Sequence, residues 1–121
     1  MQEMITGDRE LVMGLIRDPQ FGPCVMFGLG GIFTEILGDV SFRPAPLSES
    51  DAGEMIEEIK GHKILGNLRG MEAVDVSLLT QSLLAIGRIG MDHEEIQAID
   101  VNPLIVQGSR PVAVDALVVL A

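Results

Sequence analysis

Two apolar segments near the end of the chain, IQAIDVNPLIV (96–106) and PVAVDALVVL (111–120), decide the fold that we expect. Each segment is rich in β-branched residues, and the turn-forming residues QGSR separate them, which is a pattern typical of a β-hairpin. Polar side chains interrupt both segments, namely Asp100 and Asn102 in the first and Asp115 in the second. Because side chains alternate along a strand, Asp100 and Asn102 are expected on one face, with Asp115 opposite Asn102.

These three polar side chains are a candidate magnesium site. Carboxylate and amide oxygens suit Mg²⁺, which keeps several waters and takes one or two protein carboxylates together with substrate phosphates. On spacing alone, the commoner explanation is that Asp100 and Asp115 face solvent and that Asn102 caps a turn before Pro103. The spacing by itself leaves both interpretations open.

The first part of the chain predicts further strands. Short apolar runs up to Val40 are broken by turn residues, and the run 11–16 is apolar without alternation, which indicates a strand covered on both faces. The segment 41–47 contains Pro44 and Pro46, so we expect at most an edge strand there.

Two helices are expected between these strands and the hairpin. Ser48 is a good N-cap for a helix over 49–60, and Asp75 can cap a second helix that extends to about Gly90. The apolar residues of both segments recur at helical spacing. The expected fold is therefore α+β, with a mostly antiparallel sheet and two helices packed on one face.

Composition limits the function. The 121 residues suit a single domain over 1–121, and 18 acidic against 8 basic side chains give a net charge of −10, which disfavours nucleic acid and anionic membranes as partners. No apolar run is long enough to span a bilayer and the first ten residues do not resemble a secretory signal, so a cytoplasmic location is expected. The single cysteine, Cys24, is expected to be a small buried apolar residue without a catalytic role.

Other candidate ligand-binding residues lie outside the hairpin. Gly28, Gly30 and Gly31 follow an apolar strand, where backbone amides could approach a phosphate, although a bulged strand pair is the commoner meaning of such glycines. Arg43 and Arg69 stand in loop-like contexts from which a guanidinium could bind a phosphate, or could pair with one of the many acids.

Beyond these single motifs, long stretches of the sequence resemble a known family. They are RDPQFGPCVMFGLGGIFTEILGDVSFRPAPLSESDA (17–52), GNLRGMEAVD (66–75), IDVNPLIV (99–106) and VAVDAL (112–117). In this order they are similar to the C-terminal part of the ATP-grasp domain of nucleoside-diphosphate-forming acyl-CoA synthetases. That family includes the ADP-forming acetyl-CoA synthetases and is related to the β subunit of succinyl-CoA synthetase.

The resemblance implies a nucleotide site. ATP or ADP would lie between two lobes of the domain, with Mg²⁺ held by Asn102 and Asp115 and with Asp100 as a ligand or an adjacent acid. Glu3 would lie near the nucleoside, and Glu10 would face the same cleft. The implied reaction interconverts acyl-CoA, ADP and phosphate with a carboxylic acid, CoA and ATP, through an acyl phosphate and a phosphohistidine.

The resemblance also implies partners that this sequence does not contain. The upstream lobe with its lysine, the segment with the phosphorylated histidine, and the CoA-binding and ligase domains are all missing, so we expect a fragment that is inactive alone. Two alternatives are a non-catalytic acidic binding module of the same fold and a lobe of an ATP-grasp ligase that joins a carboxylate to an amine. The match through FGPCVMFGLGG and GNLRG favours the CoA-linked family over the amine ligase.

Overall fold

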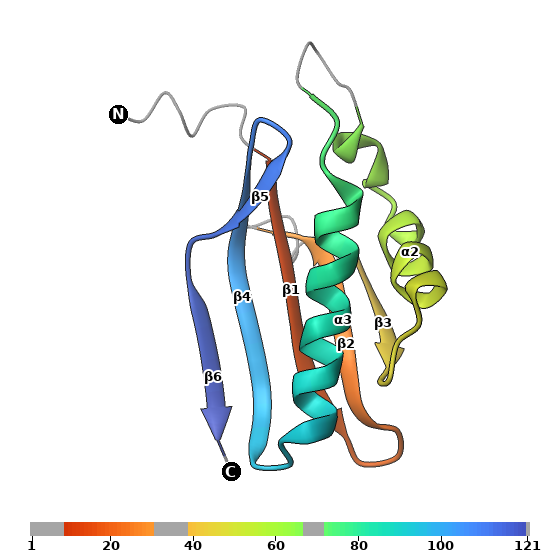
Figure 1. Ribbon diagram of the computed structural model, residues 1–121, viewed down its shortest axis with the longest axis vertical. Coiled ribbons are helices and arrows are strands. Elements are labelled where there is room, and N and C mark those ends of the chain that lie inside the picture. The colour runs from red at the N-terminus through yellow and green to blue at the C-terminus, as the bar shows by residue number, and fades with distance from the viewer. Residues whose placement is uncertain (1–8, 31–38, 67–71, 121) are drawn as a thin grey trace.

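The protein folds around one antiparallel sheet of six strands, seen in the computed structural model, which describes residues 9–30, 39–66 and 72–120 (Figure 1). The strands are β1 (Arg9–Asp18), β2 (Gly22–Leu29), β3 (Val40–Pro44), β4 (Ile96–Gln107), β5 (Arg110–Ala113) and β6 (Ala116–Leu120). They lie in the order β3-β2-β1-β4-β5, and β6 also pairs with β4. Every pairing is antiparallel, and β3 is an edge strand, as the sequence predicts.

In the described part of the chain, two α-helices cover one face of this sheet, which confirms the predicted architecture. Helix α3 (Val76–Asp92) packs on β1 and β2, whereas α2 (Glu49–Glu58) packs on β3 and α3 (Figure 1). A short 3-10 helix, η2 (His62–Leu65), follows α2. None of the helices within the described ranges is long and apolar enough to cross a membrane.

The helix ends differ from the predicted ones by about one turn or less. Helix α2 ends at Glu58 rather than at residue 60, because Ile59 is already extended and the chain then enters η2. Helix α3 continues past Gly90 to Asp92. A Cβ atom on Gly90 would overlap the side chain of Leu15, so this glycine lets α3 approach β1 closely and does not end the helix.

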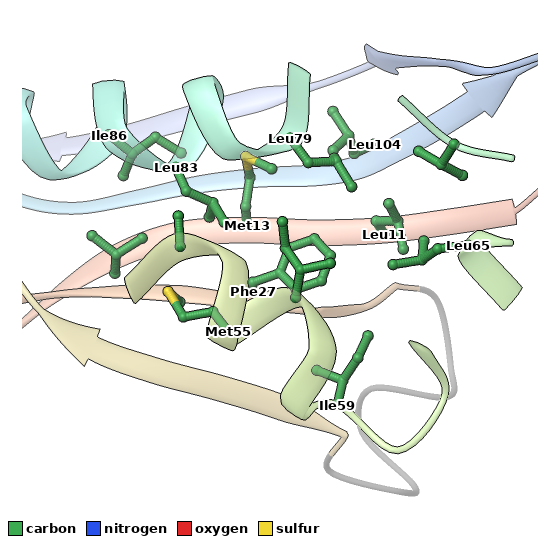
Figure 2. Packing of buried hydrophobic residues seen from close by; sticks show 14 of the residues in the cluster. Leu11, Met13, Phe27, Met55, Ile59, Leu65, Leu79, Leu83, Ile86 and Leu104 are labelled. Atoms are coloured by element: carbon green, nitrogen blue, oxygen red, sulfur yellow. The ribbon is translucent and has the colours of Figure 1, made fainter. Parts of the chain in front are cut away.

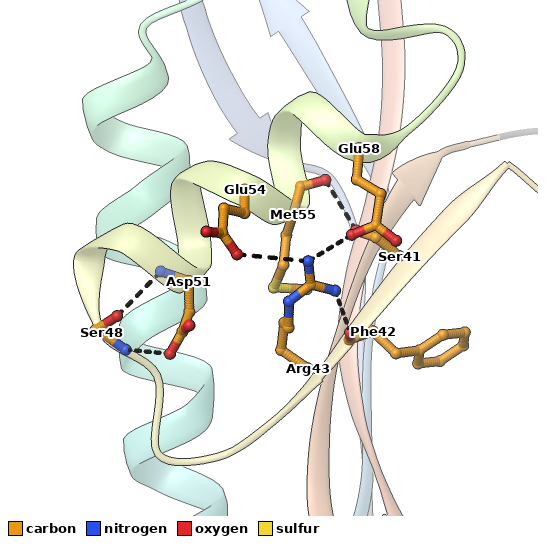
Figure 3. Close-up of polar contacts among 8 residues, drawn as sticks. All are labelled: Ser41, Phe42, Arg43, Ser48, Asp51, Glu54, Met55 and Glu58. Carbon is orange, nitrogen blue, oxygen red and sulfur yellow. Dashed lines mark hydrogen bonds and ion pairs between the residues drawn. The ribbon is translucent and has the colours of Figure 1, made fainter.

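The predicted N-caps are both present. The hydroxyl of Ser48 accepts a hydrogen bond from the amide of Asp51 at 3.0 Å, and the Asp51 carboxylate accepts one from the amide of Ser48 at 3.0 Å, a capping box (Figure 3). Hydrogen bonds from the Ser48 backbone and then its side chain lower the pKa of Asp51. This cap is therefore formed at neutral pH and is lost as the pH falls through that lowered pKa.

Replacing Asp75 by Ala should remove the cap of α3. Its carboxylate accepts a hydrogen bond from the amide of Leu78 at 3.2 Å, and loss of such a cap costs about 1 kcal/mol of unfolding free energy. Urea denaturation would measure this loss. Asp92→Ala at the other end of α3 is the matched control, because an acid there opposes the helix dipole and its removal should not destabilise the protein. Equal stability of Asp75→Ala and the wild type would contradict the capping role.

The hydrophobic core lies between the sheet and the helices (Figure 2). Leu11, Met13 and Phe27 from β1 and β2 pack against residues such as Met55 and Leu83 from α2 and α3. None of the helices formed by residues 9–30, 39–66 and 72–120 lies on the other face of the sheet, which we call the helix-free face (Figure 1).

The sequence predicts that the run 11–16 is buried on both faces of the sheet, and the burial of residues along β1 confirms this for only part of the run. Val12 projects from the face opposite to that of its core neighbours Leu11 and Met13, yet it is also buried. Strand β1 is therefore covered on both faces at this position. Ile16, further along on the helix-free face, is 46% exposed. Cys24, which pairs with Ile16, is buried, and burial followed by the nearby Asp18 charge raises the pKa of its thiol. The predicted role of Cys24 as a small buried residue is confirmed.

Candidate functional site

The helix-free face presents the polar residues of the final hairpin. Asp100 on β4 lies opposite Leu117 of β6 on one side and opposite Gly14 of β1 on the other. Residues opposite each other on antiparallel strands project from the same face, so this row runs across the face that the helices leave open. A Cβ atom on Gly14 would overlap the backbone carbonyl oxygen of Ile99, so glycine is needed for β1 to approach β4 beside Asp100.

Asn102 and Asp115 meet where the outer strand of the hairpin is interrupted. The amide of Asn102 donates a hydrogen bond to the carbonyl oxygen of Asp115 at 3.1 Å, and the amide of Val114 donates to the carbonyl oxygen of Pro103 at 3.0 Å. These two bonds bridge the break between β5 and β6. The predicted pairing of position 102 with position 115 is confirmed.

A bulge in β4 accompanies this break. Leu11 pairs with Leu104 but Met13 pairs with Val101, so β4 has one extra residue between these two pairs. The residues of β4 that face the core therefore change from an odd-numbered position, Ile99, before the bulge to an even-numbered one, Leu104, after it. Bulges of this kind redirect side chains and end regular pairing, which is common beside binding sites. Asn102 lies in the bulge.

The donor set of Asp100, Asn102 and Asp115 fits a hard cation. All three residues are exposed, and a carboxylate oxygen of Asp115 accepts a hydrogen bond from the amide of Ala116 at 2.9 Å, which restricts its orientation. Within the described ranges, no three acidic, histidine or cysteine side chains are grouped as a metal site. A metal here would therefore need the Asn102 amide oxygen together with water or ligand oxygens, a combination that suits Mg²⁺.

The glycines at the end of β2 serve close backbone packing. A Cβ atom on Gly28 would lie 2.6 Å from the carbonyl oxygen of Asp39, and one on Gly30 would lie 2.9 Å from that of Leu11. The amide of Gly30 already donates to the carbonyl oxygen of Glu10 at 2.9 Å. These contacts match the alternative interpretation of the glycines as a tight strand junction, and the phosphate-binding interpretation stays a prediction.

Arg43 lies apart from the hairpin. It pairs with Val25, a core residue, so it projects toward helix α2, where its guanidinium lies 2.6 Å from the Glu58 carboxylate and 3.7 Å from that of Glu54 (Figure 3). It also donates to the carbonyl oxygen of Phe42 at 2.8 Å. The structure therefore gives Arg43 an ion-pairing role between β3 and α2.

The remaining predicted site residues, Gly31, Arg69 and Glu3, lie outside the described residues. Among the described ones, the structure brings together Asn102 and Asp115, with Asp100 two residues away on the same strand.

Two features were not found from the sequence. One is an apolar hollow of about 450 Å³ on the helix-free side, lined by Ile16, Asp18, Phe21, Cys24, Phe42, Arg43 and Pro44. Its residues come from a turn and from three strands, so only the sheet register could reveal it. The other is Arg9, which is 6% exposed and bonds to several distant carbonyl groups.

A protein-family model described as an ATP-grasp domain matches residues 1–120. A curated relative, subunit beta of acetate–CoA ligase [ADP-forming] I from Pyrococcus furiosus, is 49% identical over 97% of this chain and 50% of that protein. Acetate–CoA ligase [ADP-forming] I from Archaeoglobus fulgidus is 43% identical over 99% of this chain and 18% of that protein. This chain thus spans 50% of the length of the first relative and 18% of the length of the second.

A solved structure shows the same fold. Dinucleotide forming acetyl-coenzyme A synthetase 1 from Ca. Korarchaeum cryptofilum is 53% identical, with a TM-score of 0.89, over 93% of this chain and 53% of that chain. That protein was solved in complex with coenzyme A and Mg-AMPPCP, with its phosphohistidine segment pointing towards the nucleotide binding site.

Proposed function

The chain belongs to the ATP-grasp domain family and is homologous to ADP-forming acetate–CoA ligases, and from that premise we propose that its helix-free face is half of a nucleotide and Mg²⁺ site. Asn102 and Asp115 would hold the metal, with Asp100 as a ligand or an adjacent acid. The complete enzyme would consist of this lobe, the other ATP-grasp lobe, and the CoA-binding and ligase domains.

The observation that carries this proposal is the meeting of Asn102 and Asp115 at the hairpin break. Their backbones are joined by a hydrogen bond of 3.1 Å, and both residues are exposed on a face that no described helix covers. An exposed carboxylate and an exposed amide at adjacent positions leave room for the waters and phosphate oxygens that Mg²⁺ requires.

The net charge of the chain supports a role for the metal. A charge of −10 repels the phosphates of a free nucleotide, so an acidic lobe needs a divalent cation between its carboxylates and the ligand. Phosphoryl transfer depends mainly on alignment and on stabilisation of charge at the phosphoryl oxygens. The residues of this chain would supply that alignment by fixing the metal and the nucleotide.

The proposed overall reaction is the interconversion of acyl-CoA, ADP and phosphate with a carboxylic acid, CoA and ATP. Curated relatives include ligases named for acetate and for 4-hydroxybutyrate, and a trans-feruloyl-CoA synthase. Their acids differ widely although each matches most of this chain, which supports a role for this lobe at the nucleotide rather than at the acyl group. We expect no turnover from the 121-residue chain alone.

These names also favour the CoA-linked reaction over the carboxylate–amine ligase, because each of these relatives is named as a CoA ligase or a CoA synthase. The non-catalytic module of the same fold differs from the proposal in one measurable respect: it would not bind a divalent cation at the hairpin.

Amide NMR of this chain with Mn²⁺ in place of Mg²⁺, with ADP present, tests the site. Paramagnetic broadening should be strongest at Asn102 and Ala116, and Asp115→Asn should abolish it. Asp92→Asn, which alters an exposed acid at the end of α3, should leave it unchanged. Broadening spread over the acidic α2 without a maximum at the hairpin would reject the proposed metal site.

A further inference from the structure

The apolar hollow on the helix-free side takes no part in the proposed nucleotide site. It lies at the end of the sheet where β1 turns into β2, and its volume is about 450 Å³. Ile16, Cys24 and Pro44 form a row across its floor, because Ile16 pairs with Cys24 and Cys24 pairs with Pro44. Phe42 adds a ring from β3 and Phe21 adds one from the turn. The hollow is large enough for the whole side chain of a partner residue.

Two phenylalanine side chains beside the hollow are exposed to solvent. Phe21 is 65% exposed and Phe42 is 44% exposed, and the ring of Phe42 points away from α2 (Figure 3). Neighbouring exposed apolar groups of this size are typical of interaction surfaces. The face of an aromatic ring also carries negative potential, which attracts a cation placed over it.

Asp18 brings a negative charge to the same hollow. One oxygen of its carboxylate accepts hydrogen bonds from the amides of Gln20 at 2.7 Å and Phe21 at 3.0 Å, which hold the group in the turn. Within residues 9–30, 39–66 and 72–120, Asp18 forms no ion pair. Its charge reaches the floor of the hollow, since burial and then the charge of Asp18 raise the pKa of the Cys24 thiol.

The two nearby arginines are occupied elsewhere. The guanidinium of Arg43 lies 2.6 Å from the carboxylate of Glu58 on α2 (Figure 3). Arg17 projects from the face opposite to that of Asp18. Its guanidinium donates to three carbonyl oxygens near the end of α3, those of Gly90 at 2.8 Å, His93 at 2.7 Å and Ile96 at 2.6 Å. The charge of Asp18 is therefore left for a cation from outside the described residues.

We propose that this hollow is a docking site for an arginine side chain of a protein partner, with the guanidinium paired with Asp18 and lying over a phenylalanine ring. A planar guanidinium can pair with a carboxylate and stack on an aromatic face at once, and its aliphatic stem packs on apolar surface. The net charge of −10 also favours a basic partner. This inference is independent of the nucleotide and Mg²⁺ site.

Amide NMR of this chain with two capped tripeptides tests the docking site. One peptide has arginine between two alanines, and the other has citrulline there, which has nearly the same shape but no charge. The arginine peptide should shift the amides of Phe21, Cys24 and Phe42 with a Kd in the millimolar range. The citrulline peptide should bind about fivefold more weakly, the effect expected for one partly exposed ion pair. Equal binding of the two peptides, or no shift at these amides with either, would overturn the proposal.

Two variants with the same loss of charge locate the effect. Asp18→Asn should weaken binding of the arginine peptide about fivefold, while its amide oxygen can still accept both hydrogen bonds of the turn. Glu57→Gln, at an exposed position of α2, should leave the affinity unchanged. Equal affinities in these two variants would contradict the pairing with Asp18. If Asp18→Asn does not fold, the comparison of arginine with citrulline on the wild-type chain decides the question.

Discussion

Asp115→Asn in the complete enzyme should lower kcat/KM for ATP formation by about 100-fold or more, because the proposed metal ligand would lose its charge where the proposed metal stabilises phosphoryl charge. The substitution preserves the size of the side chain. An asparagine oxygen can still accept the hydrogen bond from the amide of Ala116, so the local backbone should be retained. Steady-state kinetics over a range of Mg²⁺ concentrations would measure the effect.

Two companion variants sharpen this prediction. Asn102→Ala should produce a defect of the same kind, since it removes the amide oxygen beside Asp115. Asp92→Asn should retain wild-type kinetics, because that exposed acid lies at the end of α3. If Asp115→Asn and Asn102→Ala both turn over at near-normal rates and with the wild-type requirement for Mg²⁺, the assignment of the metal to the hairpin is wrong.

Phe27→Ala should be the most destabilising of the substitutions considered. Phe27 is fully buried between the sheet and the helices, close to Met55 (Figure 2). Truncation of a buried phenylalanine to alanine costs about 3–5 kcal/mol, from the lost apolar burial and from the cavity that remains. Urea or thermal denaturation of this chain would measure the loss of unfolding free energy.

Phe42 gives the control for this experiment. It lies on the neighbouring strand β3 but is 44% exposed on the helix-free side, so Phe42→Ala should cost much less than Phe27→Ala. Similar losses in the two variants would mean that the helix-free face is covered as tightly as the core, which contradicts the architecture described above.

The sequence predicts most of the fold because local signals and the tertiary structure agree. The capping residues Ser48 and Asp75 mark helix starts that the structure confirms. The alternation around Asp100 and Asn102 correctly predicts the hairpin and the partner of position 102. Helix ends were less predictable, because whether Gly90 ends a helix or permits close packing depends on Leu15, which is 75 positions away in the sequence.

The candidate site was less predictable, because its residues depend on contacts over long distances in the chain. Arg43 has the same local context whether it binds phosphate or a helix, and only the position of α2 beside β3 reveals its pairing with Glu58. Arg9 gives no local signal at all, since its carbonyl partners lie 57, 63 and 99 positions away. Single-sequence patterns do not contain such information.

The exposed strand β6 has a consequence for handling the isolated chain. Residues Leu117 to Leu120 are apolar and all exposed, and the outer edge of β6 pairs with no described strand. An apolar edge with free backbone groups is a template for pairing between molecules, and natural proteins usually protect such edges with charges or prolines, as β3 does with Pro44. For this lobe, the net charge of −10 is then the main barrier to self-association, so high salt or acidification should promote aggregation through β6.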